Sequence, residues 1–166
     1  MNYSNWIYLD CETTGLCLHS SRIVQLSLIY KDKEYNLLLN PTIPIPSQSS
    51  NVHKIYDKDV RNSQTFADIA DRLFKIFNEC EGYITYNGDS FDLNILAFEF
   101  MRCNLILPNK LSVDVYKMVQ MNESSKKLKD VYNRYIGEEL KGAHNSIFDT
   151  RATKQIHEFL LKKLSI

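Results

Sequence analysis

The 166-residue sequence contains no apolar run long enough to cross a membrane, and it contains no internal repeat or low-complexity tract. Its first residues, Met1–Trp6, lack the charged and then apolar pattern of a secretory signal, so we expect a cytoplasmic protein without membrane contact. The four cysteines form no CxxC pair and no cluster with histidine. This argues against a zinc site and favours free thiols in a reducing compartment.

Excess charge of either sign is also missing, since 20 basic residues balance 20 acidic ones. A strongly basic nucleic-acid clamp is therefore not indicated. Solvated helix faces are the simpler interpretation of the basic residues late in the chain, and a surface that follows a nucleic-acid backbone is the alternative. They are Lys126, Lys127, Lys129, Arg134, Lys141, Arg151, Lys154, Lys162 and Lys163.

The sequence does contain enough apolar and aromatic residues, 44% and 11%, for a folded domain, and its length fits one domain over residues 1–166. Apolar runs predict strands at residues 6–9, 22–30, 34–39 and 83–86. A weaker pattern at residues 111–115 predicts a short fifth strand. Helical spacing predicts helices after residue 65, over 93–100, over 126–136 and over 149–164, and the Pro- and Ser-rich stretch 40–50 predicts a loop. This order predicts an α/β domain with a mixed sheet of about five strands flanked by helices.

Four acidic residues and one histidine stand out against this framework. Asp10 and Glu12 follow the first apolar run two positions apart, so a strand would place both on one face. Asp92 lies near the start of a predicted helix, where the helix dipole favours a carboxylate. Five helical residues would separate His144 from Asp149 by about 140°, so both can reach one site only if His144 lies on a loop. Gathering four carboxylates would require divalent cations as counter-charge.

Three segments carry a family resemblance. Tyr8–Leu16, with the letters YLDCETTGL, resembles the first motif of the DEDDh-type 3′–5′ exonucleases, which are proofreading-subunit-like members of the ribonuclease H-like superfamily. Asn87–Asp92 resembles the second motif, and His144 with Asp149 resembles the third. The motifs occur in family order and span almost the whole chain. The resemblance implies a ribonuclease H-like fold and a 3′–5′ exonuclease activity.

The resemblance also implies a role for each residue. Asp10, Glu12 and Asp149 would hold the cation that activates water, and Asp10 would also reach a second cation. Asp92 would bind metal directly or through water. Oxygen ligands favour Mg²⁺ or Mn²⁺, and two ions roughly 4 Å apart would stabilise the attacking and leaving oxygens. His144 would be the general base.

The second motif departs from the usual family pattern. Asn87 lies five residues before Asp92, whereas the family asparagine usually lies four before, and Tyr86 occupies the place that a histidine often takes. We interpret this as a subgroup difference, and it leaves the substrate contact expected of Asn87 open.

Further substrate contacts are expected from similar segments. Val52–Ile55 resembles the family's Val-His-Gly-Ile segment, which would place His53 near the 3′-terminal nucleotide; an ordinary loop residue is the alternative. The resemblance assigns the pocket for that nucleotide to Thr13, Leu16 and Phe91, although Phe91 could equally belong to the core. His19 and His157 are expected to face solvent and receive no role.

The sequence thus predicts an enzyme that releases nucleoside monophosphates from single-stranded 3′ ends, with DNA as the favoured substrate. RNA and oligoribonucleotides stay open, because no residue can be tied to a 2′-hydroxyl. Two other hypotheses are a proofreading module bound to a DNA polymerase and a nuclease-fold protein that binds without cutting.

Overall fold

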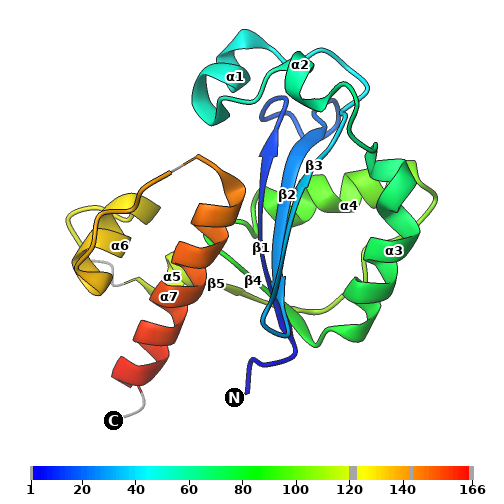
Figure 1. Ribbon diagram of the computed structural model, residues 1–166. Coiled ribbons are helices and arrows are strands. Elements are labelled where there is room, and N and C mark those ends of the chain that lie inside the picture. Colours follow the sequence, from blue (N-terminus) through cyan, green and yellow to red (C-terminus); the bar gives the residue numbers. More distant parts are fainter. Residues whose placement is uncertain (1, 120–122, 143, 165–166) are drawn as a thin grey trace.

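A mixed five-stranded sheet forms the centre of the protein, with helices packed on both of its faces (Figure 1). The structure, a computed structural model, describes residues 2–119, 123–142 and 144–164. The strands are β1 (Trp6–Thr13), β2 (Ile23–Tyr30), β3 (Lys33–Leu38), β4 (Gly82–Thr85) and β5 (Leu111–Asp114). Their order is β3-β2-β1-β4-β5; β1 is antiparallel to β2 and parallel to β4. The predicted α/β class and mixed sheet are confirmed.

The first strand is longer than its apolar run. Residues 10–13 also pair with β2, where Asp10 lies opposite Ser27 and Glu12 lies opposite Gln25. The acidic residues therefore lie within a strand, which fixes the direction of their side chains. The register shifts between Glu12 and Thr13, where this regular pairing ends.

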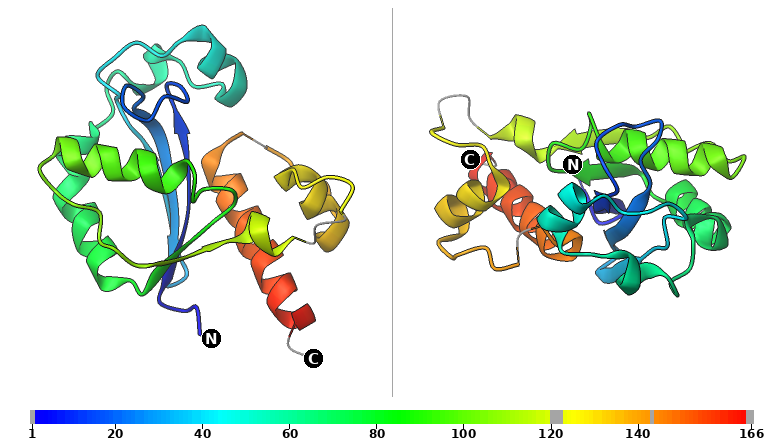
Figure 2. Two further views of the ribbon diagram at one scale, coloured as in Figure 1. Left: turned by 180° about the vertical axis from the view of Figure 1, so that it is seen from behind. Right: turned by 90° about the horizontal axis from the view of Figure 1, so that it is seen from above.

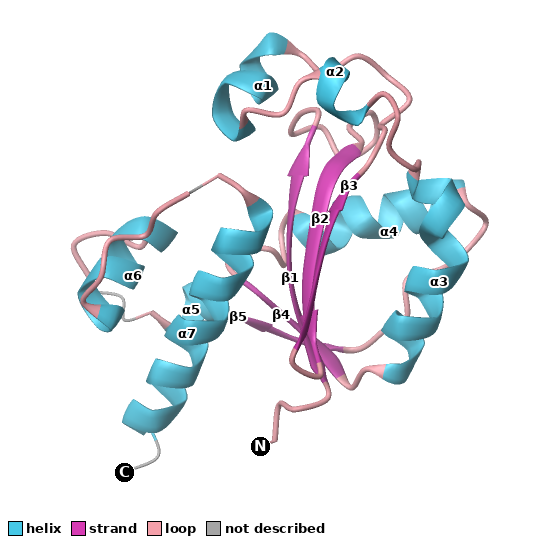
Figure 3. Cartoon of the chain, viewed as in Figure 1, coloured by secondary structure: helices cyan, strands magenta, loops and turns pink. Residues whose placement is uncertain are grey.

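The helices differ more from the sequence predictions than the strands do (Figure 3). They are α1 (Ser47–His53), α2 (Asp57–Val60), α3 (Phe66–Glu79), α4 (Asp92–Arg102), α5 (Val115–Met118), α6 (Leu128–Ile136) and α7 (Ser146–Leu164). The loop prediction for residues 40–50 is wrong from Ser47 onward. Pro46 caps the start of α1, a position where a missing N–H costs the helix nothing. No helix in the described ranges combines the length and apolar character needed to span a bilayer.

The two sides of β1 face different helix layers (Figure 2). Ile7, Leu9 and Cys11 pack into the core that α3 and α4 cover. Trp6 and Tyr8 alternate with them and pack into the second core, beneath α5, α6 and α7. Side chains at positions 10 and 12 continue this second row, so they project toward the α7 side of the sheet.

His157 corrects one expectation. The expectation that it faces solvent is wrong, because its side chain is fully buried, whereas His19 is exposed as expected. Its Nδ1 lies 2.9 Å from the hydroxyl of Tyr8, and burial lowers the pKa of His157 to about 4. Helix α7 contacts the sheet on one side and α6 on another, so it buries a broader stripe than its sequence pattern suggests.

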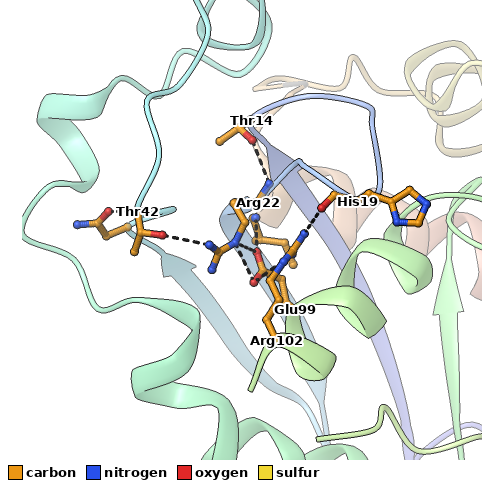
Figure 4. Close-up of polar contacts among 8 residues, drawn as sticks. Thr14, His19, Arg22, Thr42, Glu99 and Arg102 are labelled. Atoms are coloured by element: carbon orange, nitrogen blue, oxygen red, sulfur yellow. Dashed lines mark hydrogen bonds and ion pairs between the residues drawn. The ribbon is translucent and has the colours of Figure 1, made fainter. Parts of the chain in front are cut away.

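A buried carboxylate joins α4 to the start of β2 (Figure 4). Glu99 is 1% exposed, and its oxygens accept hydrogen bonds from Arg22 Nε at 2.9 and 3.1 Å. The backbone N–H of Ile23 donates to Glu99 Oε1 at 3.0 Å. A buried carboxylate with charged and backbone donors is well compensated, whereas either partner alone is costly.

The same cluster holds the loop that follows β1. The backbone N–H of Arg22 donates to Thr14 Oγ1 at 3.0 Å, and its guanidinium donates to Thr42 at 3.0 Å. Arg102 donates to the carbonyl of His19 at 2.8 Å. The loop that carries the end of the first motif is therefore fixed to α4 and to the segment after β3 (Figure 4).

Replacing Glu99 should destabilise the fold strongly. Glu99→Ala leaves Arg22 and the Ile23 N–H without their acceptor, and we expect a loss of about 3 kcal/mol in the free energy of unfolding. Glu34→Ala is a matched control, because the Glu34–Arg151 ion pair is solvent-exposed and should contribute less than about 1 kcal/mol. Urea denaturation of both variants gives the comparison. Equal losses would contradict a special role for the buried cluster.

Candidate active site

Three carboxylates meet where β1 and α7 approach each other. One carboxylate oxygen each from Asp10, Glu12 and Asp149 lies within 4.8 Å of the others. The strand supplies two of them from one face, and the first turn of α7, which packs across β1 and β2, supplies the third. Residues far apart in sequence thus form one acidic cluster. The expectation that Asp10 and Glu12 share a face agrees with this arrangement.

Asp92 approaches the cluster from α4, as the first residue of that helix. Its side chain is 8% exposed, and its Oδ1 accepts hydrogen bonds from the backbone N–H of Cys11 at 3.0 Å and from the Cys11 thiol at 3.2 Å. Although Asp92 lies outside the three-residue cluster, its negative charge raises the pKa of Asp10. The four predicted carboxylates therefore form one electrostatic unit.

Burial and mutual repulsion oppose ionisation of these groups. The pKa of Asp10 lies well above its ordinary value, first because the group is buried and then because of Asp92, Asp149 and Glu12. Burial first, and then the charges of Asp149 and Asp92, raise the pKa of Glu12 to about 8. Burial raises the pKa of Asp149 to about 6, although the N–H and the charge of His144 partly offset it. Full ionisation at neutral pH would need a nearby positive charge.

The donor atoms suit a hard divalent cation. All of them are carboxylate oxygens, the ligands that such ions prefer. Asp149 Oδ1 is buried and has no hydrogen-bond partner among the described residues. A buried oxygen without a partner is costly unless a ligand satisfies it. These residues therefore fit a bound cation between β1 and α7.

His144 lies in the turn that precedes α7, outside the helix that carries Asp149. Its backbone has φ +66°, and its N–H donates to Asp149 Oδ2 at 3.1 Å. The side chain is exposed and lines the same cavity as Asp149. The loop position inferred from helix geometry agrees with this placement.

A cavity of about 910 Å³ opens beside the acidic cluster, and we call it the carboxylate cavity. Asp10, Asp149, His144 and Asn87 contribute to its wall. Two tyrosines, Tyr86 and Tyr116, and Leu140 also line it. The remaining lining residues lie just before α6 or in its first turn: Ser125, Lys126, Lys127, Leu128, Lys129 and Asp130. Part of the basic stretch late in the chain thus lies next to the carboxylates.

A second cavity, of about 760 Å³, is lined by Glu12 and by the loops around it, and we call it the Leu16 cavity. The predicted substrate residues Thr13, Leu16, His53 and Phe91 all line it. Leu16 is 84% exposed, so its side chain presents a large apolar surface at the cavity rim. The structure brings these four residues together, and Phe91 is half-buried at the cavity rather than enclosed in the core.

His53 is the last residue of α1 and is buried. Its Nδ1 accepts a hydrogen bond from the backbone N–H of Ile55 at 3.1 Å, which leaves the proton on Nε2 in the neutral ring. Burial lowers the pKa of His53, and the Thr13 backbone partly offsets this. The alternative of an ordinary exposed loop residue is wrong.

Asp114, which the sequence analysis missed, supports the second motif. It ends β5, is 6% exposed, and its Oδ1 accepts from the backbone N–H of Asn87 at 2.7 Å and of Tyr116 at 3.1 Å. Asn87 has φ +60°, so this bond holds an unusual backbone turn. An acidic residue at the end of a short apolar run of the sequence, the position that Asp10 also has, is the signal that could have identified Asp114.

Comparison with known proteins identifies the family of the chain. The exonuclease family model (RNase_T) matches residues 7–157. An uncharacterized exonuclease, CP81 of Escherichia phage 186, is 36% identical over 85 residues, which cover 50% of this chain and 43% of that protein. The 3′-5′ exonuclease DinG of Staphylococcus haemolyticus is 23% identical over 139 residues, 79% of this chain and 15% of DinG.

A PolC-type DNA polymerase III of Clostridium perfringens is 21% identical over 165 residues, 96% of this chain and 11% of the polymerase. The chain thus spans less than half the length of each of these three relatives.

Solved structures show the same fold. The zinc-bound form of an E. coli ExoI–ssDNA complex superposes with a TM-score of 0.84 at 17% identity, over 96% of this chain and 40% of ExoI. E. coli ExoI in complex with a dA16 oligonucleotide superposes with a TM-score of 0.81 at 18% identity, over 96% of this chain and 41% of ExoI. The chain belongs to the exonuclease family, and its fold is the ribonuclease H-like fold that the resemblance implied.

Proposed function

We propose that this chain hydrolyses phosphodiester bonds from the 3′ end of single-stranded nucleic acid, with DNA favoured, and releases nucleoside monophosphates. The observation that carries the proposal is the meeting of Asp10, Glu12 and Asp149 within 4.8 Å, with Asp92 and His144 beside them. The solved ExoI complexes with single-stranded DNA support the choice of substrate. We also propose that residues 1–166 form one exonuclease domain.

The carboxylates would hold two cations, Mg²⁺ or Mn²⁺. Asp10, Glu12 and Asp149 would bind one, and Asp10 with Asp92 would bind the other. Bound cations would neutralise charge on the scissile phosphate and lower the pKa of a water molecule. His144 would accept the proton of the attacking water on its ring, since imidazole exchanges protons readily near neutral pH.

The Leu16 cavity would take the terminal nucleotide. Leu16 and Phe91 offer apolar surface against which a base can pack. Such packing does not depend on which base is present. Thr13, at the end of β1, and His53, at the end of α1, would contact the sugar of that nucleotide. Asn87, on the wall of the carboxylate cavity, would contact the strand on the other side of the cluster.

A proofreading module is the second candidate function. The PolC-type polymerase aligns with 96% of this chain while the match covers only 11% of the polymerase, which is the relation expected of a module. Sluggish digestion by the isolated chain that a DNA polymerase accelerates would favour this candidate. Faster digestion of RNA than of DNA would favour an exoribonuclease or oligoribonuclease. The absence of any digestion would favour a protein that binds nucleic acid without cutting it.

Digestion of 5′-labelled single-stranded DNA and RNA, with each cation, tests the proposal. Products that shorten from the 3′ end are expected with Mg²⁺ or Mn²⁺, and none with chelator. Asp10→Asn should reduce the rate about 10³-fold, because it removes a shared metal ligand. It should not destabilise the metal-free fold, because one buried negative charge is lost. Asp71→Asn, an exposed position on α3, is the matched control and should keep the wild-type rate.

Cation binding should stabilise the fold more at pH 8 than at pH 6. Raised carboxyl pKa values contribute stability that is present at acid pH and is lost as pH rises through about 6 for Asp149 and about 8 for Glu12. The melting temperature in chelator should therefore fall across this window, and Mg²⁺ should offset the loss. Asp149→Asn should reduce the Mg²⁺ effect. A melting temperature that does not respond to either cation would contradict the metal assignment.

His144→Ala should slow the chemical step about 10²- to 10⁴-fold while oligonucleotide affinity changes little, because a general base acts only after binding. Single-turnover rates and the Kd for labelled DNA in Ca²⁺ separate the two effects. His19→Ala, at an exposed position on the loop after β1, is the control. Equal losses in rate and affinity would assign His144 to substrate positioning instead.

A further inference from the structure

The basic residues late in the chain divide into two groups in the structure. Several are paired on the surface: Arg134 with Glu123, Arg151 with Glu34, and Lys154 with Asp32. Lys126, Lys127 and Lys129 instead line the carboxylate cavity. The interpretation as a solvated helix face fits Lys129 on α6, but it does not account for Lys126 and Lys127, which precede that helix.

Two of the three lysines keep their charge available. Lys129 lies 3.5 Å from Glu139 in an exposed ion pair. For Lys126 and Lys127, no carboxylate lies within ion-pair distance in the part of the chain that the structure describes. The ammonium of Lys126 lies 5.3 Å from the ring centre of Tyr116, a contact that orients the cation without neutralising it. Two positive charges thus stand uncompensated on one wall of the cavity.

The short segment that carries these lysines is fixed in place. The hydroxyl of Tyr86 donates to the carbonyl of Lys126 at 2.5 Å. Arg134, on α6, donates to the carbonyl of Ser125 at 3.2 Å and pairs with Glu123. Ser125 donates to Asp130 at 2.6 Å, also on α6. Because the backbone is already ordered, this segment of the protein would lose little conformational entropy when a ligand binds.

The positions of the two cavities define a path for a nucleic-acid strand. Glu12 lines the Leu16 cavity, whereas Asp10 and Asp149 line the carboxylate cavity. A strand whose terminal nucleotide occupies the Leu16 cavity and whose scissile phosphate lies at the acidic cluster must continue into the carboxylate cavity. Its next phosphates then meet Lys126 and Lys127.

We propose that Lys126 and Lys127, with Tyr116 and Tyr86 as supports, bind the internucleotide phosphates of the strand segment 5′ to the scissile bond. This inference rests on the proposed function and extends it. A lysine ammonium contacts phosphate as a point charge and reads no sequence, so the contact suits an enzyme that degrades any single strand. It also explains how a chain with no net charge attracts a polyanion, since the positive charge is concentrated beside the cluster.

The double variant Lys126→Ala/Lys127→Ala tests the proposal with two substrates. One is 5′-fluorescein-labelled dT12, and the other is the p-nitrophenyl ester of thymidine 5′-monophosphate, which has a terminal nucleotide but no upstream strand. KM for dT12 should rise about tenfold at low salt, whereas kcat/KM for the ester should stay within about twofold of wild type. Lys126→Arg/Lys127→Arg should restore the dT12 value.

Binding gives a readout that is independent of catalysis. Fluorescence anisotropy in chelator, at several salt concentrations, gives the slope of log Kobs against log salt. Loss of two phosphate contacts should make the slope shallower by about 1.4, since each contact on a single strand contributes about 0.7. Lys75→Ala/Lys162→Ala, exposed on α3 and near the end of α7, removes the same charge and should leave the slope unchanged.

The outcomes separate this inference from the proposed function. An unchanged dT12 affinity and slope in Lys126→Ala/Lys127→Ala would overturn the inference, and so would equal losses on dT12 and the ester. A wild-type chain that cuts neither substrate in Mg²⁺ or Mn²⁺ would overturn the proposed function, while the anisotropy slopes would still decide whether these lysines bind the strand.

Discussion

Repulsion among four carboxylates with little exposure to solvent is the constraint around which the rest of the site is arranged. The protein offsets part of that repulsion with its own backbone. N–H groups of Cys11 and His144 donate to Asp92 and Asp149, and both acidic residues lie in the first turn of a helix, where the dipole is positive. The raised carboxyl pKa values indicate that these contributions offset only part of the repulsion, which is consistent with the cations that we propose for the site.

Support for the site comes from structure on both sides of the sheet. Helix α7 brings Asp149 across β1 from one face, and α4 brings Asp92 from the other, where Glu99 fixes it to β2 through Arg22. The Glu99 cluster also holds the loop after β1, which forms part of the Leu16 cavity. Buried pairs of this kind favour one specific arrangement of the elements that they join.

The parts of the site that follow from local periodicity were predictable from the sequence. The shared face of Asp10 and Glu12 follows from strand alternation, and the loop position of His144 follows from the helical angle to Asp149. The burial of His157 was not predictable, and Asp114 could be noticed in the sequence but not paired with the Asn87 N–H, because both depend on partners that only the tertiary fold brings together. The short helix α1 was hidden because Pro46 introduces it, and proline usually indicates a loop.

Cys11 shows that the core and the site share a single residue. Its side chain packs among the apolar residues beneath α3 and α4, on the reverse side of β1 from Asp10 and Glu12, yet its thiol donates to Asp92. Burial and the neighbouring carboxylates keep the pKa of Cys11 well above its ordinary value, so the thiol stays protonated and is a poor target for oxidants. A small change in core packing at this position would therefore be transmitted through one hydrogen bond to Asp92, a proposed metal ligand. The residue between the two acids of the first motif thus belongs to the core and also helps to hold a carboxylate of the site.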